Sequence, residues 1–111
     1  MAIKRKMPRE KRRLRLRFGK PGQEPETLGY TQDISPAGLF VAAYKLDNLS
    51  NVIWLTVELP DEDVLLHGKV VWKRRVRREM RSLARSGFGV QLTQAPEAWY
   101  KFFMQAGYAM A

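Results

Sequence analysis

The first strong pattern in the sequence is the alternation of apolar and basic residues from position 13 to 18. Leu14, Leu16 and Phe18 fall on one face and three arginines on the other, which is the period of a half-buried β-strand. Apolar runs bounded by turn-forming residues predict further strands at 27–34, 39–44, 52–59, 64–72 and around 88–92. The turn at 35–38 makes the second and third strands a hairpin. With the first strand at 13–18, the chain carries about six short strands.

A helical period follows the last strand. Pro96 and Glu97 suit a first helical turn, and apolar residues then recur at the i, i+3, i+4, i+7 spacing, at Trp99, Phe102, Phe103 and Ala106. An amphipathic helix is therefore predicted over about 96–106. Many short strands with frequent turns and one terminal helix predict an all-β fold, a six-stranded antiparallel β-barrel with a C-terminal helix.

Length and composition limit the kind of protein. A chain of 111 residues, 45% of them hydrophobic, allows one core, so we expect a single domain at 13–111. Residues 1–12 combine like charges with Pro8 and are expected to form a flexible basic arm. With no cysteine and one histidine, the chain offers neither a disulfide framework nor the common set of metal ligands. No apolar run approaches the roughly twenty residues of a membrane helix, and no signal peptide is evident, so we expect a soluble cytoplasmic protein.

The net charge of +9 favours an anionic partner, such as a nucleotide, a nucleic acid or an anionic membrane surface. Two segments hold most of the basic residues, at 4–20 and 73–85. The second of these could be a solubilising loop, a lid over a ligand, or a contact to a polyanion.

Two motifs, separated by one strand and one loop, resemble those of a known family. Arg9 to Arg13 (REKRR) and Asp33 to Gly38 (DISPAG) resemble the RxxxR and [D/N]xSxxG motifs of PilZ domains, receptors for the bacterial second messenger cyclic di-GMP. The resemblance continues at 38–41, 57–60, 68–72 and 87–90 and so covers nearly the whole chain. It implies a six-stranded β-barrel with a C-terminal helix, as the hydrophobic pattern also does.

The residue chemistry of the motifs fits guanine and phosphate. A guanidinium can donate two parallel hydrogen bonds to O6 and N7 of guanine, stack on the base, or bind a phosphate. A carboxylate accepts hydrogen bonds from a guanine edge, a hydroxyl can reach phosphate or base, and glycine allows a close backbone approach or a positive φ. The expected ligand-binding residues are Arg9, Arg13, Asp33, Ser35 and Gly38, with Arg12 as an accessory candidate.

Each motif also has an alternative interpretation. The RxxxR spacing occurs three times among the arginines from 5 to 17; the pair Arg9 and Arg13 is chosen because the second arginine of PilZ sequences stands at the start of the first strand. Asp, Ser and Gly at the spacing of 33, 35 and 38 are also common turn formers. Trp72 is expected to pack in the core or at its rim, although it could stack on a ligand beside the basic segment.

The resemblance implies a cyclic di-GMP receptor or adapter without catalytic activity, whose output runs through an unidentified partner in motility, adhesion or polysaccharide secretion. Two alternatives stay open: a basic β-barrel that binds nucleic acid, and a PilZ-like adapter that does not bind the dinucleotide. An enzyme is not expected, since Asp61 and Asp63 lie in a turn with neither base nor nucleophile nearby.

Overall fold

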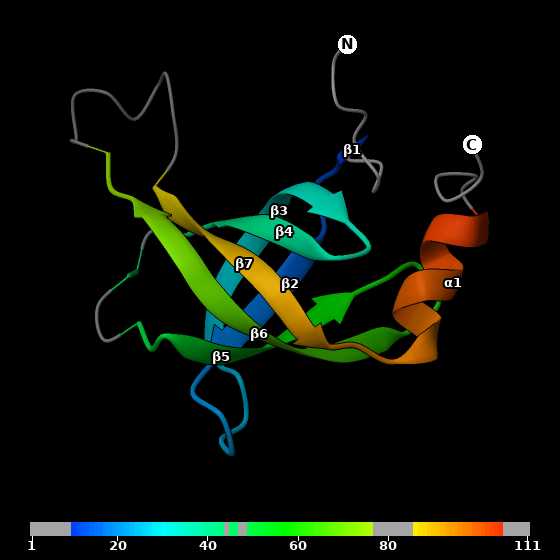
Figure 1. Ribbon diagram of the computed structural model, residues 1–111, viewed down its shortest axis with the longest axis horizontal. Coiled ribbons are helices and arrows are strands. Elements are labelled where there is room, and N and C mark those ends of the chain that lie inside the picture. Colours follow the sequence, from blue (N-terminus) through cyan, green and yellow to red (C-terminus); the bar gives the residue numbers. More distant parts are fainter. Residues whose placement is uncertain (1–9, 44, 47–48, 77–85, 106–111) are drawn as a thin grey trace, which may run out of the picture.

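The computed structural model describes residues 10–43, 45–46, 49–76 and 86–105. Within these ranges the chain forms strands and one helix in the order drawn in Figure 1. Their bounds are β1 (Glu10–Lys11), β2 (Arg15–Gly19), β3 (Thr27–Ser35), β4 (Gly38–Ala42), β5 (Val52–Glu58), β6 (Asp63–Arg74), β7 (Gly87–Gln94) and α1 (Glu97–Gln105).

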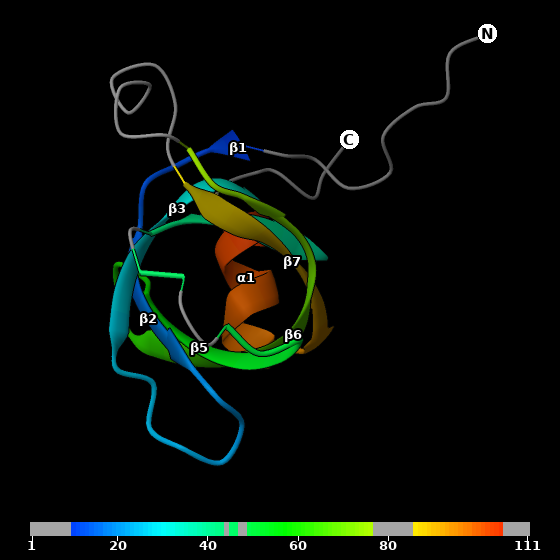
Figure 2. The same cartoon turned by 90° about the vertical axis from the view of Figure 1, so that its left-hand side faces the viewer.

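The strands close into a six-stranded antiparallel barrel. Around the ring the order is β2, β5, β6, β7, β4 and β3, and β3 pairs back with β2. The short β1 pairs with β3 beyond the end of β2, with Glu10 opposite Ile34 and Lys11 opposite Asp33. Figure 2 shows the barrel approximately along its axis, with α1 lying across one end. Closure leaves the long strands paired on both sides, which removes exposed sheet edges.

The core consists of the inward-facing residues of the strands together with one face of α1. Leu16, Leu55 and Leu66 are completely buried inside the barrel. Trp99 and Phe103 are the buried residues of α1, and their rings meet edge to face with centroids 5.1 Å apart. Burial of each such side chain contributes about 1.5–3 kcal/mol, so the helix is fixed to the barrel by its apolar face.

The structure confirms the predicted fold class, the hairpin of β3 and β4, and the C-terminal helix. The helix occupies 97–105 rather than 96–106, and residue 106 lies outside the described residues. β2 begins at Arg15 and not at Arg13, because the Leu14 amide donates to the Thr31 hydroxyl and not to a backbone carbonyl of β3, which interrupts the regular pairing. Of the expected N-terminal arm, residues 10–12 are hydrogen-bonded to β3, while residues 1–9 lie outside the described ranges.

Candidate functional site

A β-bulge in β3 determines where Asp33 lies. Thr31 and Ile34 are buried, whereas Gln32 is exposed and Asp33 is half-buried. Strict alternation would put Asp33 on the same side as Thr31, inside the barrel. The pairing register between β3 and β4 shifts between Thr31 and Asp33, which leaves Gln32 as the extra residue. The bulge therefore turns Asp33 to the outer face and returns Ile34 to the core.

A second bulge does the same for Trp72 in β6. Val70 is opposite Val90 and packs against the core, and the next paired residue is Trp72, opposite Gly89. Val71 is the extra residue. Without it, Trp72 would share the side of Val70 and point into the barrel. With it, the indole lies outside and is 49% exposed.

The two bulges bring their residues into one row across four neighbouring strands. Asp33 on β3 is opposite Phe40 on β4, Phe40 is opposite Gly89 on β7, and Gly89 is opposite Trp72 on β6. We call these four residues the outer row. Bulges frequently re-aim side chains at binding sites, and here both of them serve the same face of the barrel.

The aromatic residues of the outer row are tightly arranged. The rings of Phe40 and Trp72 are stacked, with centroids 5.0 Å apart and planes 19° apart. Gly89 makes this possible, because a Cβ at its position would lie 2.3 Å from Nε1 of Trp72. Phe40 is only 4% exposed although it lies outside the core cluster. The half-exposed indole above it is a surface on which a flat aromatic ligand can stack.

Arg74 adds a positive charge to this surface. Its Cζ lies 4.8 Å from the ring centroid of Phe40, and its Nη2 donates a hydrogen bond to Oε1 of Gln32 at 3.4 Å. Arg74 belongs to β6 and Gln32 to β3, so the side chain spans the face between them. Its backbone is opposite Gly87, where a Cβ would lie 2.6 Å from the Phe40 ring. Two glycines thus leave room for the stacked side chains.

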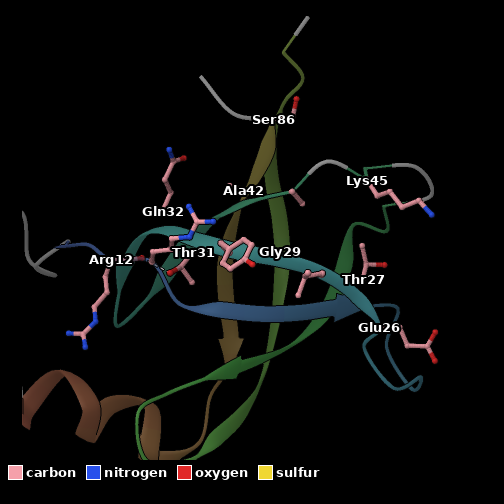
Figure 3. A pocket seen from close by; sticks show the side chains of 13 residues that line it. Arg12, Glu26, Thr27, Gly29, Thr31, Gln32, Ala42, Lys45 and Ser86 are labelled. Atoms are coloured by element: carbon pink, nitrogen blue, oxygen red, sulfur yellow. Dashed lines mark hydrogen bonds between the residues drawn. The ribbon is translucent and has the colours of Figure 1, made fainter. Parts of the chain in front are cut away.

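Arg13 lies on the β3 side of the same face. Its Cζ is 4.1 Å from the ring centroid of Tyr30, and Tyr30 is opposite Ala42 on β4. Both side chains line a pocket of ≈ 840 Å³, which includes Gln32 but none of the four residues of the outer row and so lies beside the row. Figure 3 shows this pocket along β3, with Gln32 toward one end and Lys45 toward the other. A pocket of this volume is within the range of small-molecule sites.

Arg12, the accessory candidate, points to a different partner. Its Cζ lies 4.9 Å from the ring centroid of Phe102 on α1. Consecutive arginines therefore contact β3 on one side and the helix on the other. Arg12 nevertheless lines the ≈ 840 Å³ pocket together with Arg13, and it also lines a smaller pocket of ≈ 460 Å³ beside α1, with Glu97 and Lys101.

Ser35 and Gly38 have contacts within the β3–β4 hairpin. Ser35 is 5% exposed, and its Oγ donates a hydrogen bond to the carbonyl of Gly38 at 3.2 Å. A Cβ at Gly38 would lie 2.5 Å from the backbone oxygen of Val90. Close approach of two strands, not a positive φ, is therefore the reason for glycine here. Trp99 supports the same turn, since its Nε1 donates to the carbonyl of Pro36 at 3.1 Å.

The structure thus places four of the five expected ligand-binding residues. Asp33, Ser35 and Gly38 share the β3–β4 hairpin, and Arg13 lies beside it on Tyr30, while Arg9 lies outside the described residues. The two sequence motifs did not point to Tyr30, Phe40 or Arg74. A usable signal was the GFG at 87–89, since paired glycines in a strand mark a close approach of other groups.

The described parts of the chain also bear on three other features, namely a metal site, ion pairs at the outer row and a membrane-spanning helix. There, no cluster of three or more His, Cys, Asp or Glu side chains could hold a metal ion. The ion pairs of Arg15 with Glu58 at 3.6 Å and of Lys101 with Glu97 at 3.7 Å involve no residue of the outer row. The helix found in these ranges, α1, has nine residues and is too short to cross a bilayer.

Fold and site together define a class: a small closed β-barrel whose outer face combines a motif-bearing hairpin, a stacked tryptophan and arginines. The family model described as the PilZ domain matches residues 3–99. The chain therefore belongs to the PilZ domain family.

Solved structures with the same fold include the following two. The Bacillus subtilis inhibitor of motility, MotI/DgrA, has a TM-score of 0.71 at 16% identity, covering 95% of this chain and 49% of that chain. The PilZ domain of CeSA from a cellulose-synthesizing bacterium has a TM-score of 0.58 at 15% identity, covering 88% and 92%. This chain spans about half the length of the MotI/DgrA chain. No curated protein matches the sequence.

Proposed function

We propose that this protein is a cyclic di-GMP receptor that acts as an adapter. PilZ domains are binding and adapter domains, and cyclic di-GMP is the ligand of the family. The proposed contacts are made by Arg9, Arg13 and Asp33, while Ser35 and Gly38 hold the hairpin in the shape that presents Asp33. No catalytic step is needed for this function.

The main support for this proposal is the arrangement of the outer row. Two independent bulges turn Asp33 and Trp72 to one face, where alternation alone would have put both in the core. The Asp33 carboxylate can accept hydrogen bonds from the N1 and N2 donors of guanine. The exposed indole of Trp72 offers a stacking surface for a base, worth about 1–3 kcal/mol per base in other proteins. A ligand with two guanines can use both kinds of contact.

The arginines supply the complementary charge. Arg13 on Tyr30 and Arg74 on Phe40 lie on the same outer face as the row. Charge-assisted hydrogen bonds from guanidinium to phosphate are roughly twice as strong as neutral ones. The two phosphates of a cyclic dinucleotide match a surface that carries two stacked arginines. Arg12 lines the same pocket as Arg13 and also contacts Phe102 of α1, so its proposed accessory role is to link ligand binding to the helix.

The output is proposed to run through a partner protein. Of the two similar structures, MotI/DgrA is an inhibitor of motility, and the CeSA domain comes from a cellulose-synthesizing bacterium. Partners in motility, adhesion or polysaccharide secretion, and a cytoplasmic location, are the corresponding expectations for this chain.

A second candidate function rests on the charge of β6. Lys69, Lys73 and Arg74 lie on β6 with Trp72, and Arg75 follows directly. Basic side chains around an exposed aromatic ring are typical of single-stranded nucleic-acid binding. This candidate predicts a strong dependence on salt, because phosphate contacts release counterions.

Calorimetry with three ligands distinguishes the candidates. Cyclic di-GMP should bind tightly, and cyclic di-AMP should not, because adenine has a donor where guanine has O6. A short single-stranded oligonucleotide, measured at two salt concentrations, tests the nucleic-acid alternative. Equal affinity for both dinucleotides contradicts the guanine-specific proposal, and tighter binding of the oligonucleotide at physiological salt favours the alternative.

A further inference from the structure

Residues 12–14 are held to β3 by hydrogen bonds on both sides of Arg13. The Arg12 amide donates to the carbonyl of Gln32 at 3.2 Å, and the Thr31 amide donates to the carbonyl of Leu14 at 2.9 Å. The hydroxyl of Thr31 accepts from the Leu14 amide at 2.7 Å and donates to the carbonyl of Arg12. The backbone before and after Arg13 is therefore fastened to the same buried side chain.

Thr31 is unusual among the described residues that face the core. It is 2% exposed, and the core around it is apolar. A buried hydroxyl is tolerated where it is hydrogen-bonded, and this hydroxyl both donates and accepts. Both of its partners belong to the segment that carries Arg13, not to the β3–β4 hairpin. The polar group is thus placed where it organises residues 12–14.

The side chain of Arg13 is oriented by a second contact. Its guanidinium lies over the Tyr30 ring at 4.1 Å, and Tyr30 immediately precedes Thr31 in β3. A guanidinium that stacks on a ring keeps its N–H donors in its own plane, where they remain available for a bidentate contact. The backbone and the side chain of Arg13 are therefore oriented by neighbouring residues of one strand.

We propose that Thr31 and Tyr30 are positioning residues for ligand binding: Thr31 fixes the backbone around Arg13, and Tyr30 fixes its guanidinium over the pocket. This inference rests on the proposed function, and it concerns residues outside both motifs. Positioning lowers the conformational entropy that Arg13 loses when it binds an anion. The consequence is a higher affinity that needs no contact between the Thr31 hydroxyl and the ligand, because that hydroxyl is already bonded to the backbone of Arg12 and Leu14.

The first test measures cyclic di-GMP affinity by calorimetry. Thr31→Val keeps the shape of the side chain and removes the hydroxyl, and it should weaken binding about tenfold, or ~1.4 kcal/mol. Thr31→Ser restores the hydroxyl and should bind within about threefold of the wild type, or ~0.65 kcal/mol. Tyr30→Leu should also weaken binding, whereas Tyr30→Phe keeps the ring face and should not. A folded Thr31→Val protein with wild-type affinity overturns the proposal.

A double-mutant cycle shows whether Thr31 acts through Arg13. Binding of cyclic di-GMP to an Arg13→Ala protein is followed through the amide resonances of Asp33 and Gly38. In that protein Thr31→Val should weaken binding little further, because the side chain that Thr31 positions is absent. An undiminished loss in that background would mean that Thr31 affects binding by another route, and the proposal would be wrong.

A ligand-independent measurement separates this inference from the proposed function. The Nε–H order parameter of Arg13 in the free protein should be high in the wild type and fall in Thr31→Val and Tyr30→Leu. An ordered Arg13 with no binding of cyclic di-GMP would contradict the proposed ligand and keep the positioning role. A mobile Arg13 in the free wild-type protein contradicts the positioning role itself.

Discussion

Gly89→Ala tests the outer row selectively, because it replaces none of the residues that are proposed to contact the ligand. The three atoms nearest to the added Cβ all belong to Trp72: Nε1 at 2.3 Å, Cε2 at 2.6 Å and Cδ1 at 2.9 Å. Such distances force the indole away from Gly89 and from its stack on Phe40. We expect the protein to lose the aromatic pair, about 0.5–1.5 kcal/mol of stability. The ligand should lose a stacked base, about 1–3 kcal/mol of binding free energy.

The assay is calorimetry with cyclic di-GMP, together with thermal unfolding of the same variant. Affinity should fall by roughly five- to 150-fold, which corresponds to about 1–3 kcal/mol. The matched controls are two proteins: the single variant Trp72→Ala, and the double variant that carries both Trp72→Ala and Gly89→Ala. Once the indole is absent, the added methyl group meets none of the atoms named above, so the two control proteins should behave alike. Wild-type affinity in the Gly89→Ala protein would refute the role of Trp72.

Three further predictions follow from the same geometry. Arg13→Ala should weaken cyclic di-GMP binding about ten- to a hundredfold, the size of a charge-assisted hydrogen bond, whereas Arg17→Ala should change little in calorimetry; the reverse order would contradict the chosen motif register. Trp99→Phe leaves the Pro36 carbonyl without its indole donor, so chemical denaturation should show a stability loss of about 1–3 kcal/mol, and an unchanged stability would contradict this anchoring. Replacing the arginines at 77, 78 and 81 with glutamine should keep dinucleotide affinity within about tenfold, and a larger loss measured by titration would assign that segment to the ligand site.

The barrel could be predicted from the sequence because each long strand buries one face. Alternation such as that of Leu14, Leu16 and Phe18 reports this directly, and the i, i+3, i+4 pattern around Trp99 reports the helix in the same way. The two-residue β1 has no such pattern. It is defined by the pairing of residues 10–11 with the end of β3, a contact between segments that are distant in the sequence.

The site was only partly predictable, because a bulge depends on the pairing between strands. Asp33 was expected at the site from its motif, but the reason for its outward position is the extra residue Gln32. Trp72 was expected in the core or at its rim, since it continues the apolar run of Val70 and Val71. The shift at Val71 puts it outside instead. One extra residue moves the side chains that follow it to the opposite face of the sheet, and the propensities of the single residues do not predict where it occurs.

We propose that the outer row binds cyclic di-GMP, and the indole groups of the three tryptophans allow a test of this binding within one protein. Trp72 belongs to the row; Trp54 stacks on His67 with centroids 4.5 Å apart, on the β5–β6 pair; and Trp99 is buried under the barrel. In a nitrogen–proton NMR titration with cyclic di-GMP, we expect a large shift of the Trp72 indole resonance and almost none for Trp54. A saturating titration in which Trp72 stays unshifted, or in which Trp54 shifts most, would contradict binding of cyclic di-GMP at the outer row.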